Sequence, residues 1–284
     1  MSFNDTKFEL LIYGKHEEIK NCRSYKTLAG VDIEEKNIVK DLGVVMNSDA
    51  TFETHIGQVV RKCRMQMGWI LRTFSSRDEL TMLTLYRSLI LPLLEYCCQL
   101  WPPWKLNESK ALEGVQRTFT SKISTLSTYN YLNRLRELHL YSLERRRERY
   151  IIIYTWKIIN GVVPNVSNVG VTIRTHPRLG IMCVPLKVNI RSGRLTTIRY
   201  HSLSVVGPRL YNSLPKYLRD LKNVSTETFK NRLDNYLRSV PDEPCLDHYR
   251  TAANSNSIDD QLCYLRNNGI NILEEEAPPC PGSP

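Results

Sequence analysis

Arginine is the residue type whose placement says most about chemistry in this chain. Of six basic side chains, Arg145, Arg146 and Arg149 lie on the first turns of one predicted helix, and Arg117, Lys122 and Arg134 come from the segments that precede it. The forked donors of arginine suit phosphate oxygens, so packed helices that carry these side chains predict a basic surface for nucleic acid. The alternative is that Glu144 and Glu148, on the same helix, hold the arginines in surface ion pairs.

A second basic stretch, residues 174–209, mixes arginines with Tyr200 and two histidines. Its candidate phosphate ligands are Arg191, Arg194 and Arg199. Single-stranded nucleic-acid binders combine positive charge with aromatic rings in this way. Tyr200 and Tyr211 are equally well explained as core residues, so the pattern leaves both readings open.

The charge of the chain is regional. The formal net charge is +10, and residues 115–173 hold nine Lys/Arg against three Asp/Glu. Residues 174–238 hold thirteen against three, whereas residues 239–284 reverse the balance with two against eight. The middle of the chain therefore favours a polyanionic partner, and the acidic end is expected to be disordered.

Carboxylates arranged for metal chemistry are not apparent. Nucleotide transfer needs carboxylates that hold two metal ions roughly 3.5–4 Å apart. The only adjacent aspartate pair, Asp259 and Asp260, is surrounded by loop-forming residues, and the cluster around Asp32 is typical of a solvated turn. The Cys245-x-x-His248 spacing has no matching second pair. We predict no catalytic residue, no metal site and no cofactor.

The elements that position these side chains follow from hydrophobic periodicity. Residues 8–13, 25–33 and 36–46 have the composition of antiparallel strands. Apolar residues at steps of three and four predict a helix over residues 56–74, with Arg61 and Arg72 facing away from its apolar stripe. Further helices are expected from Asp78 to a stop or kink at Pro92, from Asn107 through 123, over 132–138, over 143–158, and from Ser225 or Thr226 through 237.

Eight cysteines without a CxxC pair indicate a reduced, intracellular protein, with nucleus and cytoplasm left open. The longest apolar run, residues 89–94, is far shorter than the roughly 20 residues a membrane span needs. We therefore expect neither a membrane nor a small-molecule substrate among the partners.

Two short motifs and a colinear series behind them carry a family resemblance. The motifs are Asn4-x-x-Lys7 and Asp41-Leu42-Gly43. The series that follows is Leu85-Tyr86-Arg87-Ser88-Leu89, Glu113-x-Val115-Gln116-Arg117, Leu143-Glu144-Arg145-Arg146-Arg147, Tyr211-Asn212-Ser213-Leu214-Pro215 and Phe229-Lys230-x-x-Leu233-Asp234. Over residues 3–238 the chain resembles the end of the palm, the thumb and the C-terminal flank of reverse transcriptases from non-LTR, LINE-type (jockey-like) retrotransposons.

The resemblance implies roles for four residues. Lys7 corresponds to a palm lysine near the incoming nucleotide, and Asp41, Leu42 and Gly43 correspond to the turn that grips the primer end. In that family the catalytic aspartates lie upstream of the position of residue 3. A truncated reverse transcriptase (RNA-directed DNA polymerase) that binds nucleic acid without polymerising is therefore expected.

The predicted fold class is α+β and mainly helical. We expect palm-like antiparallel strands over residues 1–50, a thumb-like bundle over 51–163, a basic region over 164–240 and an acidic tail over 241–284. The expected partner is RNA or DNA. The alternatives are a protein-interaction module that docks on another reverse transcriptase chain or a host protein, and a retroelement relic without a selected function.

Overall fold

The computed structural model describes residues 7–13, 25–165, 172–177, 180–184, 200–244, 246, 253 and 255–270. It is mixed α and β, about 54% helical, with two small antiparallel sheets in the described ranges. The chain forms two compact units, residues 1–119 and 120–284. The fold class is confirmed at this level, while the correspondence to palm and thumb, and the four predicted domain ranges, stay predictions.

The first unit begins with a hairpin of β1 (Ile38–Asp41) and β2 (Val44–Asn47), in which Asp41 pairs with Val44. The segment predicted as one strand over 36–46 thus folds back at Leu42 and Gly43. These two residues have φ of 43° and 88°. Positive φ at both central positions is the geometry of the two-residue turn that matches the twist of paired strands.

The two strands predicted earlier in the chain are wrong. Residues 8–13 and 25–33 contribute only isolated bridges, Leu10 with Glu35 and Lys26 with Asp32. Neither segment buries an alternating apolar face, because Phe8, Tyr13 and Leu28 are exposed. Without such a face a β-ladder lacks the packing that stabilises it.

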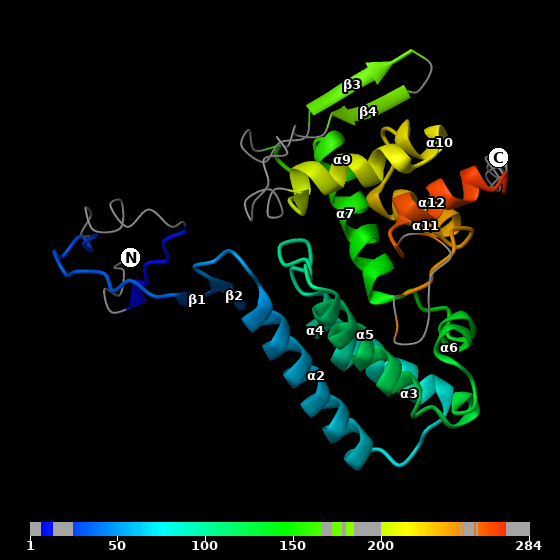
Figure 1. Cartoon of the computed structure of the whole chain (residues 1–284), viewed down its shortest axis with the longest axis horizontal. Helices are drawn as coiled ribbons and strands as arrows, with labels where there is room; N and C mark the ends of the chain where they lie inside the picture. The colour runs from blue at the N-terminus through cyan, green and yellow to red at the C-terminus, as the bar shows by residue number, and fades with distance from the viewer. Residues whose placement is uncertain are drawn as a thin grey trace. The chain divides into compact units, whose positions relative to one another are not determined.

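Helix α2 (Glu53–Thr73) confirms the best sequence prediction. Its buried stripe includes Ile56, Val59, Val60, Cys63 and Ile70, which recur at helical steps. The hairpin leads directly into this helix (Figure 1). Burial of the stripe against the rest of the unit leaves the opposite face of α2 exposed.

The next helical run does not stop at Pro92. Asp78 caps α3 (Glu79–Leu85) as predicted, because its carboxylate accepts a hydrogen bond from the Thr81 backbone N–H at 2.9 Å. The run then widens into a π turn, η2 (Tyr86–Ile90), and continues as α4 (Leu91–Glu95). The N–H of Leu91 reaches back to the Tyr86 carbonyl, which accommodates a proline one residue later.

Helix α5 (Leu106–Thr120) begins before its predicted cap. Asn107 lies inside the helix, and the side chain of Glu108 instead accepts hydrogen bonds from the backbone N–H groups of Trp104 and Lys105 at 2.9 and 3.2 Å. A glutamate that reaches back over the first turn satisfies donors that the helix itself leaves open. The Asn107 cap prediction is therefore wrong.

The second unit contains seven helical segments and one hairpin within the described ranges. In chain order they are η3 (Ser124–Leu126), α6 (Tyr131–Glu137), α7 (Leu143–Ile159), β3 (Thr172–His176), β4 (Gly180–Val184), α9 (Leu203–Ser213), α10 (Lys216–Arg219), α11 (Thr226–Leu237) and α12 (Ile258–Asn267). The predicted caps of α11 and the predicted end of α7 are confirmed, with Ser225 accepting from the Thr228 N–H and Gly161 at φ 71° after the last turn.

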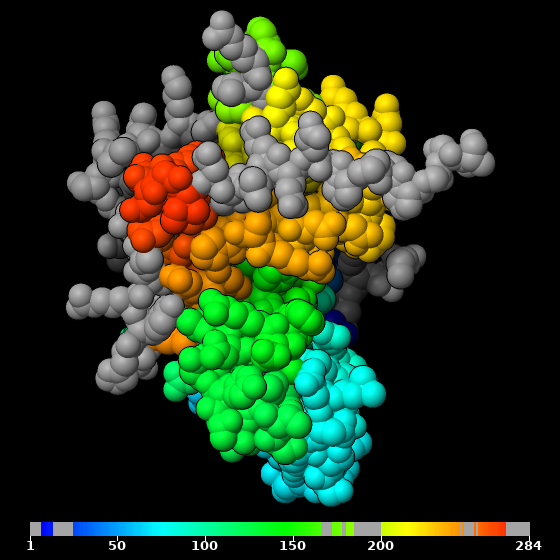
Figure 2. All heavy atoms as spheres, turned by 90° about the vertical axis from the view of Figure 1, so that its right-hand side faces the viewer, coloured from blue at the N-terminus to red at the C-terminus, as the bar shows by residue number. Residues whose placement is uncertain are grey.

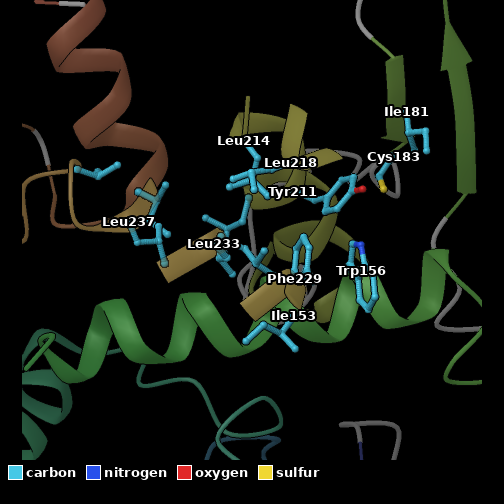
Figure 3. Close-up of a cluster of buried hydrophobic side chains, with 14 of the residues drawn as sticks. Ile153, Trp156, Ile181, Cys183, Tyr211, Leu214, Leu218, Phe229, Leu233 and Leu237 are labelled. Carbon is cyan, nitrogen blue, oxygen red and sulfur yellow. The ribbon is translucent and has the colours of Figure 1, made fainter. Parts of the chain in front are cut away.

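The core of the second unit gathers around α7. Trp156 stacks on Phe229 with ring centroids 4.5 Å apart, and Tyr211, Leu218 and Leu233 are fully buried beside them. Figure 3 shows these side chains converging from α7, α9, α10 and α11. Helix α9 was not predicted, because Gly207 and Pro208 have the composition of a turn. Its burial against α7 offsets the hydrogen bond that Pro208 removes.

The expected disordered tail is wrong for α12, which adds Ile258, Leu262 and Leu265 to the buried residues. Its N-terminus is held from α7, where the Glu148 carboxylate accepts hydrogen bonds from the Ser257 hydroxyl at 2.6 Å and the Ile258 N–H at 2.8 Å. Figures 1 and 2 both show α12 beside α11. Asp259 and Asp260 lie in the first turn of this helix rather than in a loop.

Gly207 is the point of closest approach between α9 and α7. A Cβ atom built there would lie 2.6 Å from Oγ1 of Thr155, which is fully buried and donates to the Ile151 carbonyl. We expect Gly207→Ala to lower the free energy of unfolding of the second unit by about 1–3 kcal/mol, because the two helices must separate. Hydrogen exchange of α9 peptides in urea measures this loss. Gly114→Ala on α5, where a Cβ would meet nothing within 4 Å, is the control and is expected to be neutral or stabilising.

The second unit also contains a pH-sensitive carboxyl. Burial, together with the nearby Glu148 and Asp242, raises the pKa of Glu144 from 4.5 to about 7. A raised pKa means that folding favours the protonated form, so this stability is present below pH 4.5 and is lost as the pH rises through 7. We expect the second unit to be about 2 kcal/mol less stable at pH 8 than at pH 5 from this group. Urea unfolding at both pH values checks it, and Glu144→Gln should reduce the difference.

Candidate nucleic-acid interface

Three of the arginines predicted to contact phosphate are used inside the second unit. Arg145 is completely buried, and its guanidinium donates to the carbonyls of Pro241 at 2.7 Å, Asn256 at 3.3 Å and Val240 at 3.4 Å. It holds the segment after α11 onto α7. A guanidinium with no exposed atoms has nothing to offer a phosphate, so we withdraw Arg145 from the interface.

Arg134 and Arg149 also make internal contacts. Arg134 is buried and donates to the Tyr129 carbonyl at 2.8 Å and to Oγ1 of Thr120 at 3.3 Å. Arg149 forms a two-point ion pair with Asp234 of α11, at 2.5 and 2.6 Å. The predicted surface ion pairs of Glu148 with these arginines are likewise replaced, since that carboxylate caps α12.

Of the other basic residues predicted to bind phosphate, three are at least partly exposed and three lie outside the described residues. Arg117 and Lys122 are exposed and Arg146 is half-buried. Arg191, Arg194 and Arg199 lie outside the residues that the structure describes. No single basic surface that combines all nine can therefore be drawn from the described residues.

The two tyrosines near this stretch have different environments. Tyr211 is a core residue, as one reading held, and its hydroxyl donates to the Arg219 carbonyl at 2.6 Å. Tyr200 is 48% exposed, and its hydroxyl accepts from Arg209, whose guanidinium lies 5.2 Å from the ring.

The turn predicted to resemble a primer grip is exposed and anchored. The Leu42 side chain is 83% exposed. Its φ is positive, a backbone conformation that is energetically unfavourable for residues other than glycine. The Tyr96 hydroxyl donates to the Leu42 carbonyl at 2.8 Å and secures the turn. Asp41 and Gly43 are exposed beside it, and Lys7 is exposed at the start of the described chain.

A buried histidine joins the hairpin to α2. Nδ1 of His55 accepts a hydrogen bond from the Val45 N–H at 3.3 Å, and the ring meets Trp101 edge-on at 5.0 Å. Burial and the neighbouring Lys62 charge lower the pKa of His55, which keeps the imidazole neutral and Nδ1 able to accept. The position of the hairpin on α2 is thus set by a polar contact inside the unit.

The exposed face of α2 carries a cluster of cations. Arg61, Lys62, Arg64 and Arg72 are all exposed, and none has an acidic partner among the described residues. Steps of three and eight residues place Arg61, Arg64 and Arg72 on one side of the helix. We call these four cations, with Met65 and Trp69 between them, the α2 face.

Two grooves adjoin this face, both within the first unit. One, of about 760 Å³, runs between α2 and the start of α5 and is lined by Arg61, Arg64 and Lys105 over an apolar floor of Ile56 and Val60. Its acids are engaged, since Glu53 pairs with Lys105 at 2.5 Å and Glu108 caps α5. Uncompensated positive charge is therefore what this groove offers a ligand.

The second groove, of about 680 Å³, is lined by Lys62, Arg64, Trp69, Arg72 and Leu93, with no acidic residue in its lining. We call it the Trp69 groove. Arg64 and Met65 line both grooves, so the two grooves adjoin at these side chains. Phosphate oxygens are the ligand class that unpaired guanidinium groups at this spacing suit best.

No protein-family model, curated protein or solved structure matches this chain.

Two further findings concern the described residues. None of their helices combines the length and apolar composition needed to cross a lipid bilayer. Among the same residues no group of three or more His, Cys, Asp or Glu side chains converges as metal ligands would.

The α2 face was missed as a site, although its signal was present. Arg61 and Arg72 were correctly placed opposite the apolar stripe. The regional charge count nevertheless favoured residues 115–238 as the binding region. A charge count gives the number of basic residues in a segment, but it does not show which of them are paired with acidic groups in the fold. Exposed Met65 and Trp69 between the cations were the distinguishing feature.

Proposed function

We propose that the chain binds nucleic acid through the α2 face, as a fragment of the non-LTR reverse transcriptase type that does not polymerise by itself. The observation that carries the proposal is four exposed cations on one helix, which have no acidic partners among the described residues and line two adjoining grooves. A polyanion supplies the charges that these groups lack.

The hairpin turn supports the same proposal. A strained, exposed turn at Leu42 and Gly43 is held in place by Tyr96, and such backbone outliers concentrate at binding sites. By the resemblance this turn would contact a primer end. The absence of polymerisation is proposed because no position of residues 1–284 matches the aspartate motifs that the resemblance requires.

A salt titration tests the proposal. With four phosphate contacts, the logarithm of the affinity for a single strand should fall with the logarithm of the salt concentration at a slope of about −3. Fluorescence anisotropy of a labelled oligonucleotide between 50 and 300 mM KCl measures the slope. Absence of binding at the lowest salt, or a flat dependence, would contradict the proposal.

A protein partner is the second candidate, favoured by the exposed apolar side chains of Leu28, Val31, Ile38 and Leu42. Monomeric proteins rarely leave contiguous apolar patches uncovered. Another reverse transcriptase chain would bind there by burying these side chains, and that complex should survive high salt. Changing Leu28 and Val31, which lie outside the hairpin turn, to serine should weaken it and leave oligonucleotide binding at low salt intact, which separates the two candidates.

A further inference from the structure

The Trp69 groove combines positive charge with an exposed aromatic ring. Trp69 is 46% exposed, although tryptophan is ordinarily among the more buried residues. Its ring meets Phe74 edge-on, with centroids 6.0 Å apart and the planes 81° apart. This contact holds the indole in one orientation while leaving part of the ring accessible.

Three cations share this groove with the ring. Lys62, Arg64 and Arg72 line the same groove, and the eleven steps from Arg61 to Arg72 span about 16 Å of helix. No acidic group lines this groove, and the indole N–H has no acceptor among the described residues. The site thus pairs charges suited to a phosphate backbone with an aromatic surface and a free donor suited to a base.

We infer that the Trp69 groove binds single-stranded nucleic acid by stacking an unpaired base on the Trp69 indole, with its phosphates on Arg64 and Arg72. This rests on the proposed function, and it adds a strand preference. In a duplex both faces of each base are covered by neighbouring base pairs, so a duplex offers the ring nothing to stack on. Stacking and charge together are how single strands are bound without sequence readout.

The experiment compares three probes of equal length: a 12-nucleotide single strand, the matching duplex, and a 12-unit abasic strand that keeps the phosphates without bases. Wild-type protein should bind the base-bearing single strand about tenfold more tightly than the abasic strand. Trp69→Ala should lose about tenfold for the single strand and less than twofold for the other two probes. Trp69→Phe, which keeps a ring, should recover most of the loss.

Each outcome decides a separate point. Trp69→Ala binding all three probes like wild type would overturn the stacking inference and leave the proposed function standing. An equal loss for all three probes, with an unchanged circular dichroism spectrum, would also overturn it, because the indole would then act on the backbone. Failure of wild-type protein to bind any probe at low salt would overturn the proposed function and the inference with it.

Discussion

Replacing Arg145 with methionine should lower the free energy of unfolding of the second unit by about 3–5 kcal/mol at pH 8. Arg145 is a fully buried cation where α7 meets the described residues between 240 and 258, and its charge lowers the pKa of the Glu144 and Glu148 carboxyls, which burial raises. Without it these carboxylates stay buried without compensation, and three carbonyls lose their donor. Hydrogen exchange of α7 and α12 peptides in urea measures the effect in this unit alone.

The same variant should be less damaging in acid. Removing Arg145 raises the pKa of both glutamates further, so at pH 5 they take up protons and the uncompensated charge disappears. The control is Arg146→Met, one residue along the same helix, where the side chain is only half-buried. A decrease in the free energy of unfolding below 1 kcal/mol for Arg145→Met, or a decrease that is equal at both pH values, would show that Arg145 does not compensate the charges of Glu144 and Glu148.

Neutralising Arg61, Arg64 and Arg72 together with glutamine should reduce the affinity for a single strand by about 100-fold or more at 50 mM salt. Each lost phosphate contact lowers the magnitude of the salt slope by about 0.7, so the triple variant should lose about 2 from the slope. Glutamine is polar and has a helix propensity close to that of arginine, and all three side chains are exposed, so α2 should remain folded.

The matched control for this triple variant removes the same charge elsewhere. Lys40, Lys216 and Lys222 are exposed and have no acidic partner among the described residues, and changing them to glutamine lowers the net charge equally. Binding that follows net charge alone would fall alike in both triple variants. Such a result would remove the α2 face from the account.

Local signals in the sequence predicted the parts of the fold that depend on local chemistry. The stripe from Ile56 to Ile70 defines α2, and the caps at Asp78 and Ser225 each need only a side chain and a backbone N–H three residues on. Helices α9 and α12 escaped prediction because distant contacts stabilise them. In α9, a residue larger than glycine at position 207 would collide with the Thr155 side chain of α7. The first turn of α12 is capped by Glu148, which lies more than a hundred residues earlier in the chain.

The candidate site shows the same division. The sequence shows where the arginines are but not what surrounds them in the fold. The residues next to Arg145 and Arg149 are of the same types as those in a solvent-exposed basic helix. Only tertiary structure reveals that one is buried on carbonyls and the other is paired with Asp234. The α2 face is the reverse case, because it carries only a few cations but those cations are exposed and have no acidic partner among the described residues.

The position of a bound strand on the protein is the most direct test of the central claim. A single-stranded oligonucleotide carrying photoreactive thiouridines is crosslinked to the full chain, and the adducts are mapped by mass spectrometry after cleavage at acidic residues. The α2 face predicts adducts within residues 57–72, with Trp69 among them, and their loss in the Arg61, Arg64 and Arg72 triple variant. Adducts confined to residues 120–284, with α2 unmodified, would contradict it.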